Sequence, residues 1–332
     1  MNVLRLNACT FPMLQEERDI LSELRSSVTE IEGDTDEEII GYADRADAVM
    51  IVSAYLKAPV FRALKKCRII SRLGTGYDKI DVEQATRQGI MVTNIPDFCT
   101  DEVADHTMAL LLASARRIKK YDSMMRNGEK PIGPDGIHRL SVQTVGLVGF
   151  GRIGSAVARR CLGFGLKVLA YDPGLTPEKA AKESVAMATL DQLLVESDYL
   201  CLLCPLLPST RKMIAMRQLE KMKRTAVLVN TGRGELVDEV DLATALKTGL
   251  IGFAALDVFA GINVFAQEGF KTDHPFLALD NVLVTPHVSA NSEESLTDSR
   301  RRGAQAVVDV LNGKWPKHLV NPDVKPWFDM AG

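Results

Sequence analysis

The sequence predicts an α/β protein with two parallel sheets, and three observations support this class. The chain has 332 residues, which is enough for about two domains of ordinary size. Short β-branched runs alternate with longer amphipathic stretches, a pattern typical of parallel strands joined by helices. A glycine-rich turn, Gly149–Gly154, directly follows one of the apolar runs and opens a helical stretch.

The first hundred residues predict alternating strands and helices. Each predicted strand is a short apolar run rich in β-branched residues, and each predicted helix has apolar residues at helical spacing. The strands are predicted at residues 3–6, 48–53, 69–73 and 90–94, and the helices at 15–26, 36–44, 60–66 and 82–88. A long helix is predicted next, from Asp101 to about Asn127, with acidic residues at its start and basic residues towards its end.

A second series of strand and helix patterns begins near residue 142. Its strands are predicted at residues 144–148, 167–171, 199–204, 226–230, 254–258 and 282–285. A last helix is predicted from Glu293 to Leu311, because Asn312 and Gly313 then form a stop signal. The basic run Arg300–Arg302 is expected to form a solvated face of this helix.

Composition excludes several classes of protein. The 40 Lys and Arg against 43 Asp and Glu give a net charge of -3, so no basic excess predicts nucleic-acid binding. The longest apolar run, Met108–Ala115, is too short to span a bilayer, and the N-terminus lacks a signal-peptide pattern. Six cysteines in so long a chain do not predict a disulfide framework, so we expect a cytoplasmic protein. Cys201 and Cys204 lack a second pair or a nearby histidine, so no metal site is predicted.

The glycine-rich turn has the G-x-G-x-x-G spacing of a Rossmann dinucleotide site. Gly149 permits the tight turn, Gly151 lets the backbone approach a pyrophosphate, and Gly154 lets helix and strand pack closely. Asp172 ends the next predicted strand, 23 residues after Gly149, where a carboxylate binds the ribose hydroxyls of NAD and repels the phosphate of NADP. The alternatives are a glycine turn without a ligand and an Asp172 that serves only its own Tyr-Asp-Pro-Gly turn.

Three later strands are followed by polar residues. Arg233 and His287 come after predicted strands, Asp257 lies at the end of the strand between them, and ligands in such folds bind at the carboxyl ends of the strands. An arginine can hold a carboxylate and polarise a carbonyl, and a histidine can pass a proton near neutral pH. The set therefore suits hydride transfer beside a carboxylate. Taken singly, Arg233 could be a surface residue and His287 a neighbour of a helix cap.

The chain resembles the D-isomer-specific 2-hydroxyacid dehydrogenases over nearly its whole length. This family includes hydroxypyruvate and glyoxylate reductases, phosphoglycerate dehydrogenases and the C-terminal binding protein corepressors. Several motifs in the right order carry the resemblance: Gly74–Asp81, Asp101–Thr107, Gly149–Gly154, Cys204–Thr210, Asn230–Glu239, Ala255–Phe259 and Thr285–His287.

The resemblance implies a fold, a reaction and a set of site residues. The fold would be two Rossmann-like parallel-sheet domains, with residues 1–100 plus 289–332 as the substrate lobe and 101–288 as the NAD-binding domain. The reaction would be hydride transfer between NAD and a D-2-hydroxy acid and 2-keto acid pair, in a homodimer that pairs through the NAD-binding domain. Arg233 would be the substrate-binding arginine, His287 the acid/base, and the backbone of Thr75 and Gly76 the carboxylate site. The cofactor contacts would be Thr107, Gly149, Gly151, Arg152, Ile153, Gly154, Asp172, Cys204, Pro205, Thr210, Thr231 and Asp257.

One position departs from the family pattern. The family places a glutamate five residues after the aspartate of its D-V-F motif, where it pairs with the histidine and raises the pKa of that histidine. Five residues after Asp257 stands Ile262, whereas the segment Glu268–Pro275 resembles the family's sequence around that glutamate. The second alignment assigns the role to Glu268, and the two remain open.

Two other functions remain alternatives. If the glutamate is absent, the chain could be an NAD(H)-sensing, corepressor-like binding protein with little turnover. An enzyme acting on a substrate without a carboxylate is the third hypothesis. The other histidines, His106, His138, His274 and His318, have no motif that predicts catalysis.

Overall fold

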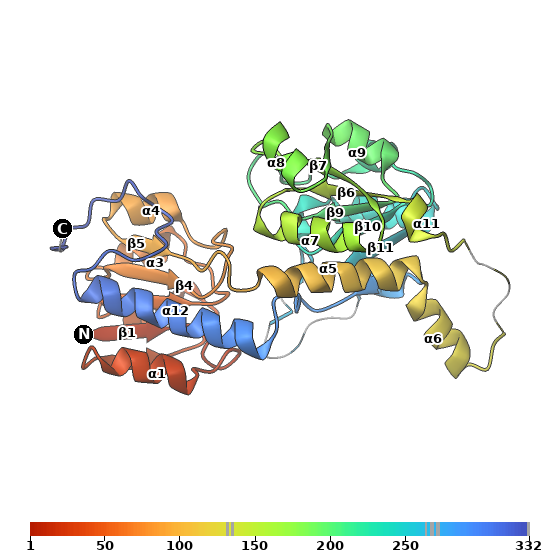
Figure 1. Cartoon of the computed structure of the whole chain (residues 1–332). Coiled ribbons are helices and arrows are strands. Elements are labelled where there is room, and N and C mark those ends of the chain that lie inside the picture. The colour runs from red at the N-terminus through yellow and green to blue at the C-terminus, as the bar shows by residue number, and fades with distance from the viewer. Residues whose placement is uncertain (131–132, 134–135, 263, 266–268, 270–272, 331–332) are drawn as a thin grey trace. The chain divides into compact units, whose positions relative to one another are not determined.

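The chain forms two compact units, each built on its own parallel sheet (Figure 1). The structure is a computed structural model that describes residues 1–130, 133, 136–262, 264–265, 269 and 273–330. Unit 1 takes its described residues from Met1–Phe98, Phe265–Glu268 and Ser292–Gly332. Unit 2 takes its described residues from Cys99–Val264 and Gly269–Asn291.

The sheet of unit 1 has five strands in the order β2-β1-β3-β4-β5, and every neighbouring pair is parallel. Helices cover both of its faces. Alternation along β1 sends Leu4 to the face covered by α2, α3 and α4, and Val3 to the face covered by α1 and α12. The strands are β1 (Asn2–Arg5), β2 (Ser27–Glu30), β3 (Ala48–Ile51), β4 (Ile69–Arg72) and β5 (Met91–Thr93). The helices are α1 (Gln15–Ser22), α2 (Asp36–Ala43), α3 (Ala58–Ala63), α4 (Val82–Arg87) and α12 (Glu293–Leu311).

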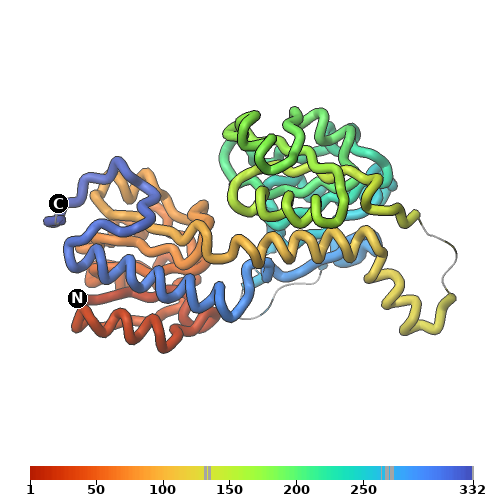
Figure 2. The backbone as a smooth tube through the Cα atoms, viewed as in Figure 1, coloured from red at the N-terminus to blue at the C-terminus, as the bar shows by residue number. Residues whose placement is uncertain are grey.

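The C-terminal segment completes unit 1. The tube in Figure 2 shows α12 running beside α1 along one face of the sheet, although the two helices stand at opposite ends of the chain. Close packing depends on Gly303, because a Cβ there would overlap the side chain of Leu73, and Ser71 Oγ donates to the Gly303 carbonyl at 2.9 Å. The predicted fold, two parallel-sheet domains with the N-terminal lobe completed from the C-terminus, is confirmed.

The sheet of unit 2 has seven strands in the order β12-β11-β10-β9-β6-β7-β8, again all parallel. One face packs under α5, α7 and α8, and the other under α9, α10 and α11. The strands are β6 (Thr144–Val148), β7 (Lys167–Tyr171), β8 (Ala186–Met187), β9 (Tyr199–Leu202), β10 (Val227–Asn230), β11 (Phe253–Leu256) and β12 (Val282–Val284). The helices are α5 (Thr100–Ala115), α7 (Arg152–Gly163), α8 (Pro177–Lys182), α9 (Leu190–Glu196), α10 (Met216–Leu219) and α11 (Glu239–Lys247).

The prediction of one helix from Asp101 to Asn127 is wrong. The helix ends at Ala115, and a second helix, α6 (Ile118–Arg126), begins after Arg117. Arg117 has φ of 55°, in the left-handed region, which breaks the hydrogen-bond ladder between the two helices. None of the residues of α6 is buried, so this helix has no apolar face covered within the described chain.

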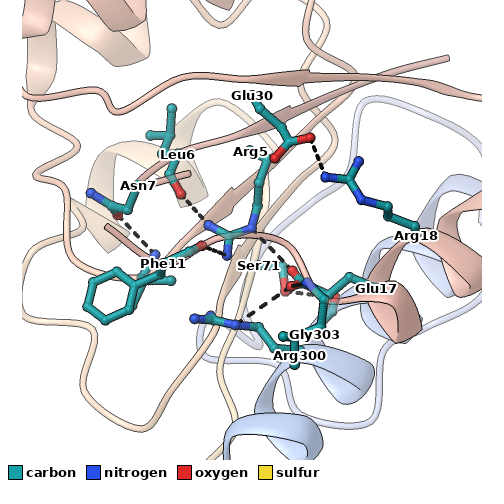
Figure 3. Close-up of polar contacts among 12 residues, drawn as sticks. Arg5, Leu6, Asn7, Phe11, Glu17, Arg18, Glu30, Ser71, Arg300 and Gly303 are labelled. Atoms are coloured by element: carbon teal, nitrogen blue, oxygen red, sulfur yellow. Dashed lines mark hydrogen bonds and ion pairs between the residues drawn. The ribbon is translucent and has the colours of Figure 1, made fainter. Parts of the chain in front are cut away.

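The prediction that Arg300–Arg302 forms a solvated face is wrong for Arg300, which is 2% exposed (Figure 3), whereas Arg301 is exposed. Arg300 Nε lies 3.7 Å from Glu17 Oε2, and Arg5 Nε donates to Glu17 Oε1 at 3.2 Å. Burial lowers the pKa of Arg5, against the attraction of Glu17. Burial, with the charge of Arg5, lowers the pKa of Arg300 to about 10. Two cations therefore share one carboxylate inside unit 1.

Within the described residues, no helix has the length and apolar character needed to cross a membrane. The same part of the chain holds no group of three or more His, Cys, Asp or Glu side chains suited to a metal ion.

Candidate active site

The predicted site residues of unit 2 follow strands whose ends meet at one edge of its sheet. Asn230 of β10 pairs with Leu256 of β11, and Leu256 pairs in turn with Val284 of β12. Arg233, Asp257 and His287 stand one to three residues beyond these ends. The structure thus carries all three past the same edge as the Gly149–Gly154 turn, which follows β6 in the same parallel sheet.

The geometry of the glycine-rich turn fits a dinucleotide. Gly149 has φ of +101°, and a Cβ there would lie 2.7 Å from the backbone nitrogen of Cys204. A Cβ at Gly154 would overlap the carbonyl oxygen of Gly149, whereas a Cβ at Gly151 would meet no atom within 4 Å. Gly151 is therefore not required by packing within the chain. The space beside it, at the N-terminus of α7, suits a pyrophosphate.

Asp172 lies at the end of β7 beside this turn and is half-buried. Its Oδ2 accepts from the backbone N–H of Phe150 at 2.7 Å, and its Oδ1 accepts from Gly174 at 2.7 Å. Lys179 Nζ donates to the Phe150 carbonyl at 2.9 Å. Burial raises the pKa of the nearby Cys204 thiol to about 11, and the charge of Asp172 acts in the same direction. The carboxylate thus holds the backbone of the glycine-rich turn in addition to any ligand it binds.

Two predicted cofactor contacts, Thr107 and Thr231, lie together. Thr107 is fully buried on α5, and its Oγ1 lies 2.8 Å from Oγ1 of Thr231, which follows β10. Thr107 Oγ1 donates to the Val103 carbonyl at 2.7 Å, so Thr231 is the donor between the two hydroxyls.

Arg233 is presented by a turn that Asn230 holds. Asn230 Nδ2 donates to the Arg233 carbonyl at 2.9 Å, and Asn230 Oδ1 accepts from the backbone of Gly232 at 3.1 Å. One side-chain nitrogen of Arg233 donates to the Gly232 carbonyl at 2.8 Å. A Cβ at Gly234 would overlap the backbone of Phe259, so the turn after Arg233 packs directly against the segment that follows β11. Arg233 is half-buried, and this contact ties its side chain to its own turn.

Asp257 is fully buried, and its carboxylate faces the segment that carries His287. Asp257 Oδ1 accepts from Thr285 Oγ1 at 2.6 Å and from the Val288 N–H at 3.0 Å, while Oδ2 accepts from the Ser289 N–H at 3.0 Å. The His287 N–H donates to the Asp257 carbonyl at 2.8 Å. His287 has φ of 56°, a conformation that L-residues adopt only where surrounding contacts enforce it. Asp257 supplies those contacts.

His106, for which the sequence predicts no role, also lies at this cluster. Its Nε2 is 3.0 Å from Thr285 Oγ1 and 3.5 Å from Asp257 Oδ1. The signal that could have found it is its place in the Asp101–Thr107 motif, directly before the predicted cofactor contact Thr107. Its partners stand more than 150 residues away in the sequence, so no local pattern reveals the contact.

The remaining predicted residues fall into two groups. In unit 2, Thr210 Oγ1 donates to the Pro205 carbonyl at 2.7 Å, and Arg152 and Ile153 begin α7. In unit 1, Thr75 and Gly76 follow β4, where Asn94 Nδ2 donates to the Thr75 carbonyl at 2.7 Å and Arg72 Nε to the Gly76 carbonyl at 2.8 Å. Glu268 lies outside the described residues, and Ile262 is half-buried.

Comparison with known proteins identifies a matching family model, similar sequences and similar solved structures. Residues 108–289 match the sequence model of the D-isomer specific 2-hydroxyacid dehydrogenase, NAD binding domain. The chain is 41% identical over 281 residues to glyoxylate reductase of Korarchaeum cryptofilum, covering 83% of this chain and 82% of that protein. It is 36% identical to D-3-phosphoglycerate dehydrogenase of Methanocaldococcus jannaschii, covering 94% of this chain and 58% of that protein. The solved structure of D-lactate dehydrogenase from Aquifex aeolicus, complexed with NAD and lactic acid, matches with a TM-score of 0.85, 28% identity, and coverage of 96% and 99%.

Proposed function

The chain belongs to the D-isomer specific 2-hydroxyacid dehydrogenase family, and we propose that its keto substrate is a short 2-keto acid of the glyoxylate type. The predicted activity, NAD-linked hydride transfer between a D-2-hydroxy acid and a 2-keto acid, is confirmed at the level of the family. The glyoxylate reductases among the similar proteins support the choice of a short substrate. The structural observation that supports the dehydrogenase chemistry is that Arg233, His287 and the glycine-rich turn follow strands of one parallel sheet at one edge.

The proposed roles follow from the chemistry of each side chain. Arg233 carries a permanent positive charge on a planar fork, so it would bind the substrate carboxylate and polarise the carbonyl oxygen. His287 would give a proton to that oxygen on reduction and take it back on oxidation. NADH, when bound, supplies the hydride. Asp257 would hold the His287 segment, which is the role that its contacts support.

The cofactor would lie along the edge from β7 to β12. Gly149, Gly151 and Gly154, with Arg152 and Ile153 at the start of α7, would receive the pyrophosphate. Asp172 would bind the adenosine ribose and favour NAD over NADP. The other proposed cofactor contacts are Thr107, Cys204, Pro205, Thr210, Thr231 and Asp257.

In unit 1, we propose that the backbone N–H groups of Thr75 and Gly76 bind the substrate carboxylate. The three contacts that support this proposal hold the loop in one conformation: those of Asn94 and Arg72, and a hydrogen bond from Thr75 Oγ1 to the Ile95 carbonyl at 3.2 Å. An ordered loop can present backbone donors without a large entropic cost of binding. On this basis residues 1–100 with 289–332 would form the substrate lobe, and 101–288 the NAD-binding domain.

We also propose a homodimer formed through unit 2. In α6 no residue is buried, and Ile118 and Met125 are 55% and 80% exposed. Val142 in the following segment is 75% exposed. Apolar side chains exposed together on one helix are typical of a surface that a partner covers.

The fully buried thiols of Cys67 and Cys201 are in keeping with a reducing, cytoplasmic setting.

The proposal is tested by NADH oxidation against a panel of keto acids that includes glyoxylate, pyruvate and hydroxypyruvate. Arg233→Gln should lower kcat/KM by roughly 100- to 1,000-fold, because it removes the charge that binds the carboxylate and the developing oxyanion. Arg211→Gln is the matched control, since Arg211 is exposed in the loop after β9, and it should retain full activity. If NADH binds while no keto acid is reduced, the enzyme proposal fails and the corepressor-like alternative is supported.

A further inference from the structure

His106 belongs to a hydrogen-bonded cluster at the segment that carries His287. The contacts run from His106 Nε2 to Thr285 Oγ1 at 3.0 Å and from Thr285 Oγ1 to Asp257 Oδ1 at 2.6 Å, and His106 Nε2 also lies 3.5 Å from Asp257 Oδ1. All three residues are in unit 2. Asp257 is fully buried, and the His106 side chain is 22% exposed, so the cluster is largely shielded from water.

The direction of the bonds follows from counting protons. The Asp257 carboxylate only accepts, so the single hydroxyl proton of Thr285 points at Asp257 Oδ1. The Thr285 oxygen can then only accept from its other neighbour, and Nε2 of His106 must carry a proton and donate it. His106 thereby adds a second restraint on the Thr285 hydroxyl, beside the bond of that hydroxyl to Asp257 Oδ1.

The same carboxylate determines the backbone around His287. Asp257 also receives the N–H groups of Val288 and Ser289, and its own carbonyl receives the N–H of His287. His287 keeps a left-handed φ of 56°, a conformation that costs free energy in any residue other than glycine. Loss of one donor would leave the carboxylate freer to rotate, and the turn that presents the imidazole would relax.

We propose that His106 is a positioning residue, acting through Thr285 and Asp257 to hold the turn that presents His287. The catalytic part of this inference rests on the proposed role of His287 as the acid/base. His106 donates one hydrogen bond and does not act on the substrate. The property that matters is a donor at Nε2, which glutamine can replace and phenylalanine cannot.

The test compares His106→Gln with His106→Phe, and His138→Phe serves as a control in the same unit. His106→Phe should lower kcat by about 10- to 100-fold, because small displacements of a catalytic group have effects of this size, while the Kd of NADH changes little. His106→Gln should stay within a few-fold of the wild-type kcat, and His138→Phe should match the wild type. Equal losses in the Gln and Phe variants would mean that the donor at Nε2 is not the property that matters, and would overturn the proposal.

Two further measurements separate this inference from the proposed function. Hydrogen exchange of the Val288 and Ser289 amides should be faster in His106→Phe and in Thr285→Val, and unchanged in His106→Gln. The double variant His106→Phe/Thr285→Val should show amide exchange no faster, and kcat no lower, than Thr285→Val alone, because the two residues act in series. Unchanged exchange in His106→Phe overturns the inference even if activity falls. A wild type that reduces no keto acid, but whose variants show the exchange pattern, overturns the proposed function alone.

Discussion

Glu17 in unit 1 and Asp257 in unit 2 are both fully buried carboxylates, but they are stabilised in different ways. Glu17 faces the guanidinium groups of Arg5 and Arg300, which come from β1 and α12, and its Oε2 also accepts from the Leu14 N–H at 3.0 Å. Asp257 accepts from one hydroxyl and two backbone N–H groups within a single short segment, residues 285–289, and His106 Nε2 lies 3.5 Å away. The first arrangement joins elements from opposite ends of the chain. The second fixes the backbone of one loop.

The difference shows what each kind of contact is suited to do. Long arginine side chains bridge separate elements and tolerate small shifts between them, but they bring charges that must be desolvated. Hydrogen bonds from backbone N–H groups tolerate much smaller shifts, because a displacement of the carboxylate also displaces the main chain that is bonded to it. A loop that presents a catalytic side chain needs the second kind of restraint. We therefore expect damage at Glu17 to appear as lost stability, and damage at Asp257 as lost activity.

The largest expected effect on stability is that of Glu17→Gln. The substitution removes the carboxylate charge that both buried guanidinium groups face, which should cost about 3–5 kcal/mol of unfolding free energy. Both tryptophans, Trp315 and Trp327, lie in unit 1, so denaturant titration followed by tryptophan fluorescence reports on this unit.

The matched control is Glu30→Gln at the ion pair with Arg18, whose side chains are 31% and 46% exposed. It should cost less than about 1 kcal/mol. Arg300→Met should cost less than Glu17→Gln, because it leaves a balanced pair of Arg5 and Glu17. Equal losses in Glu17→Gln and Glu30→Gln would show that the buried cluster is not a charge-dependent contact.

Asp257→Asn comes next and tests the other half of the comparison. The amide nitrogen of Asn must face at least one of the donors that now point at the carboxylate, so one hydrogen bond becomes a repulsion. We expect kcat to fall by roughly 100-fold, with a stability loss of about 1–3 kcal/mol by calorimetry. A large loss of stability with normal kcat per folded molecule would reverse the contrast between the two clusters.

These two clusters also show where sequence reasoning reaches and where it stops. The alternation of strands and helices, the Gly149–Gly154 turn and the order of Arg233, Asp257 and His287 are local patterns, and they predicted the fold and the edge that carries these residues. The break at Arg117 could not be predicted, because an arginine in the left-handed region leaves no local signal. The burial of Arg300 and the contact of His106 with Thr285 depend on residues far away in the sequence.

Asp172 is an intermediate case, a half-buried carboxylate held by the backbone N–H groups of Phe150 and Gly174. Asp172→Asn keeps the shape but removes the charge that is expected to repel the phosphate of NADP. The ratio of kcat/KM for NADH over that for NADPH should fall by about tenfold or more, measured with one keto acid at fixed pH. An unchanged ratio would limit Asp172 to holding the turn, as its two hydrogen bonds already do.

The smallest expected effect uses Cys204 as a probe of the same charge. Burial, aided by the charge of Asp172, raises the pKa of the Cys204 thiol from 9.0 to about 11. Because the thiolate is the reactive form, iodoacetamide should label Cys204 slowly at pH 8, and the rate should rise as pH increases towards 11. Exposed Cys9 should be labelled far faster at pH 8 and serves as the internal reference, read by peptide mass spectrometry.

Asp172→Asn should move the Cys204 profile towards lower pH, because it removes a charge that opposes the thiolate. The shift should be modest, since burial is the larger cause and the substitution leaves it in place. The stability contribution has the matching sign: the folded state keeps its proton where the unfolded chain loses it, so stability falls between pH 9 and about 11. If Asp172→Asn leaves the profile in place, the carboxylate acts on the turn only through its two hydrogen bonds, as Asp257 acts on residues 285–289.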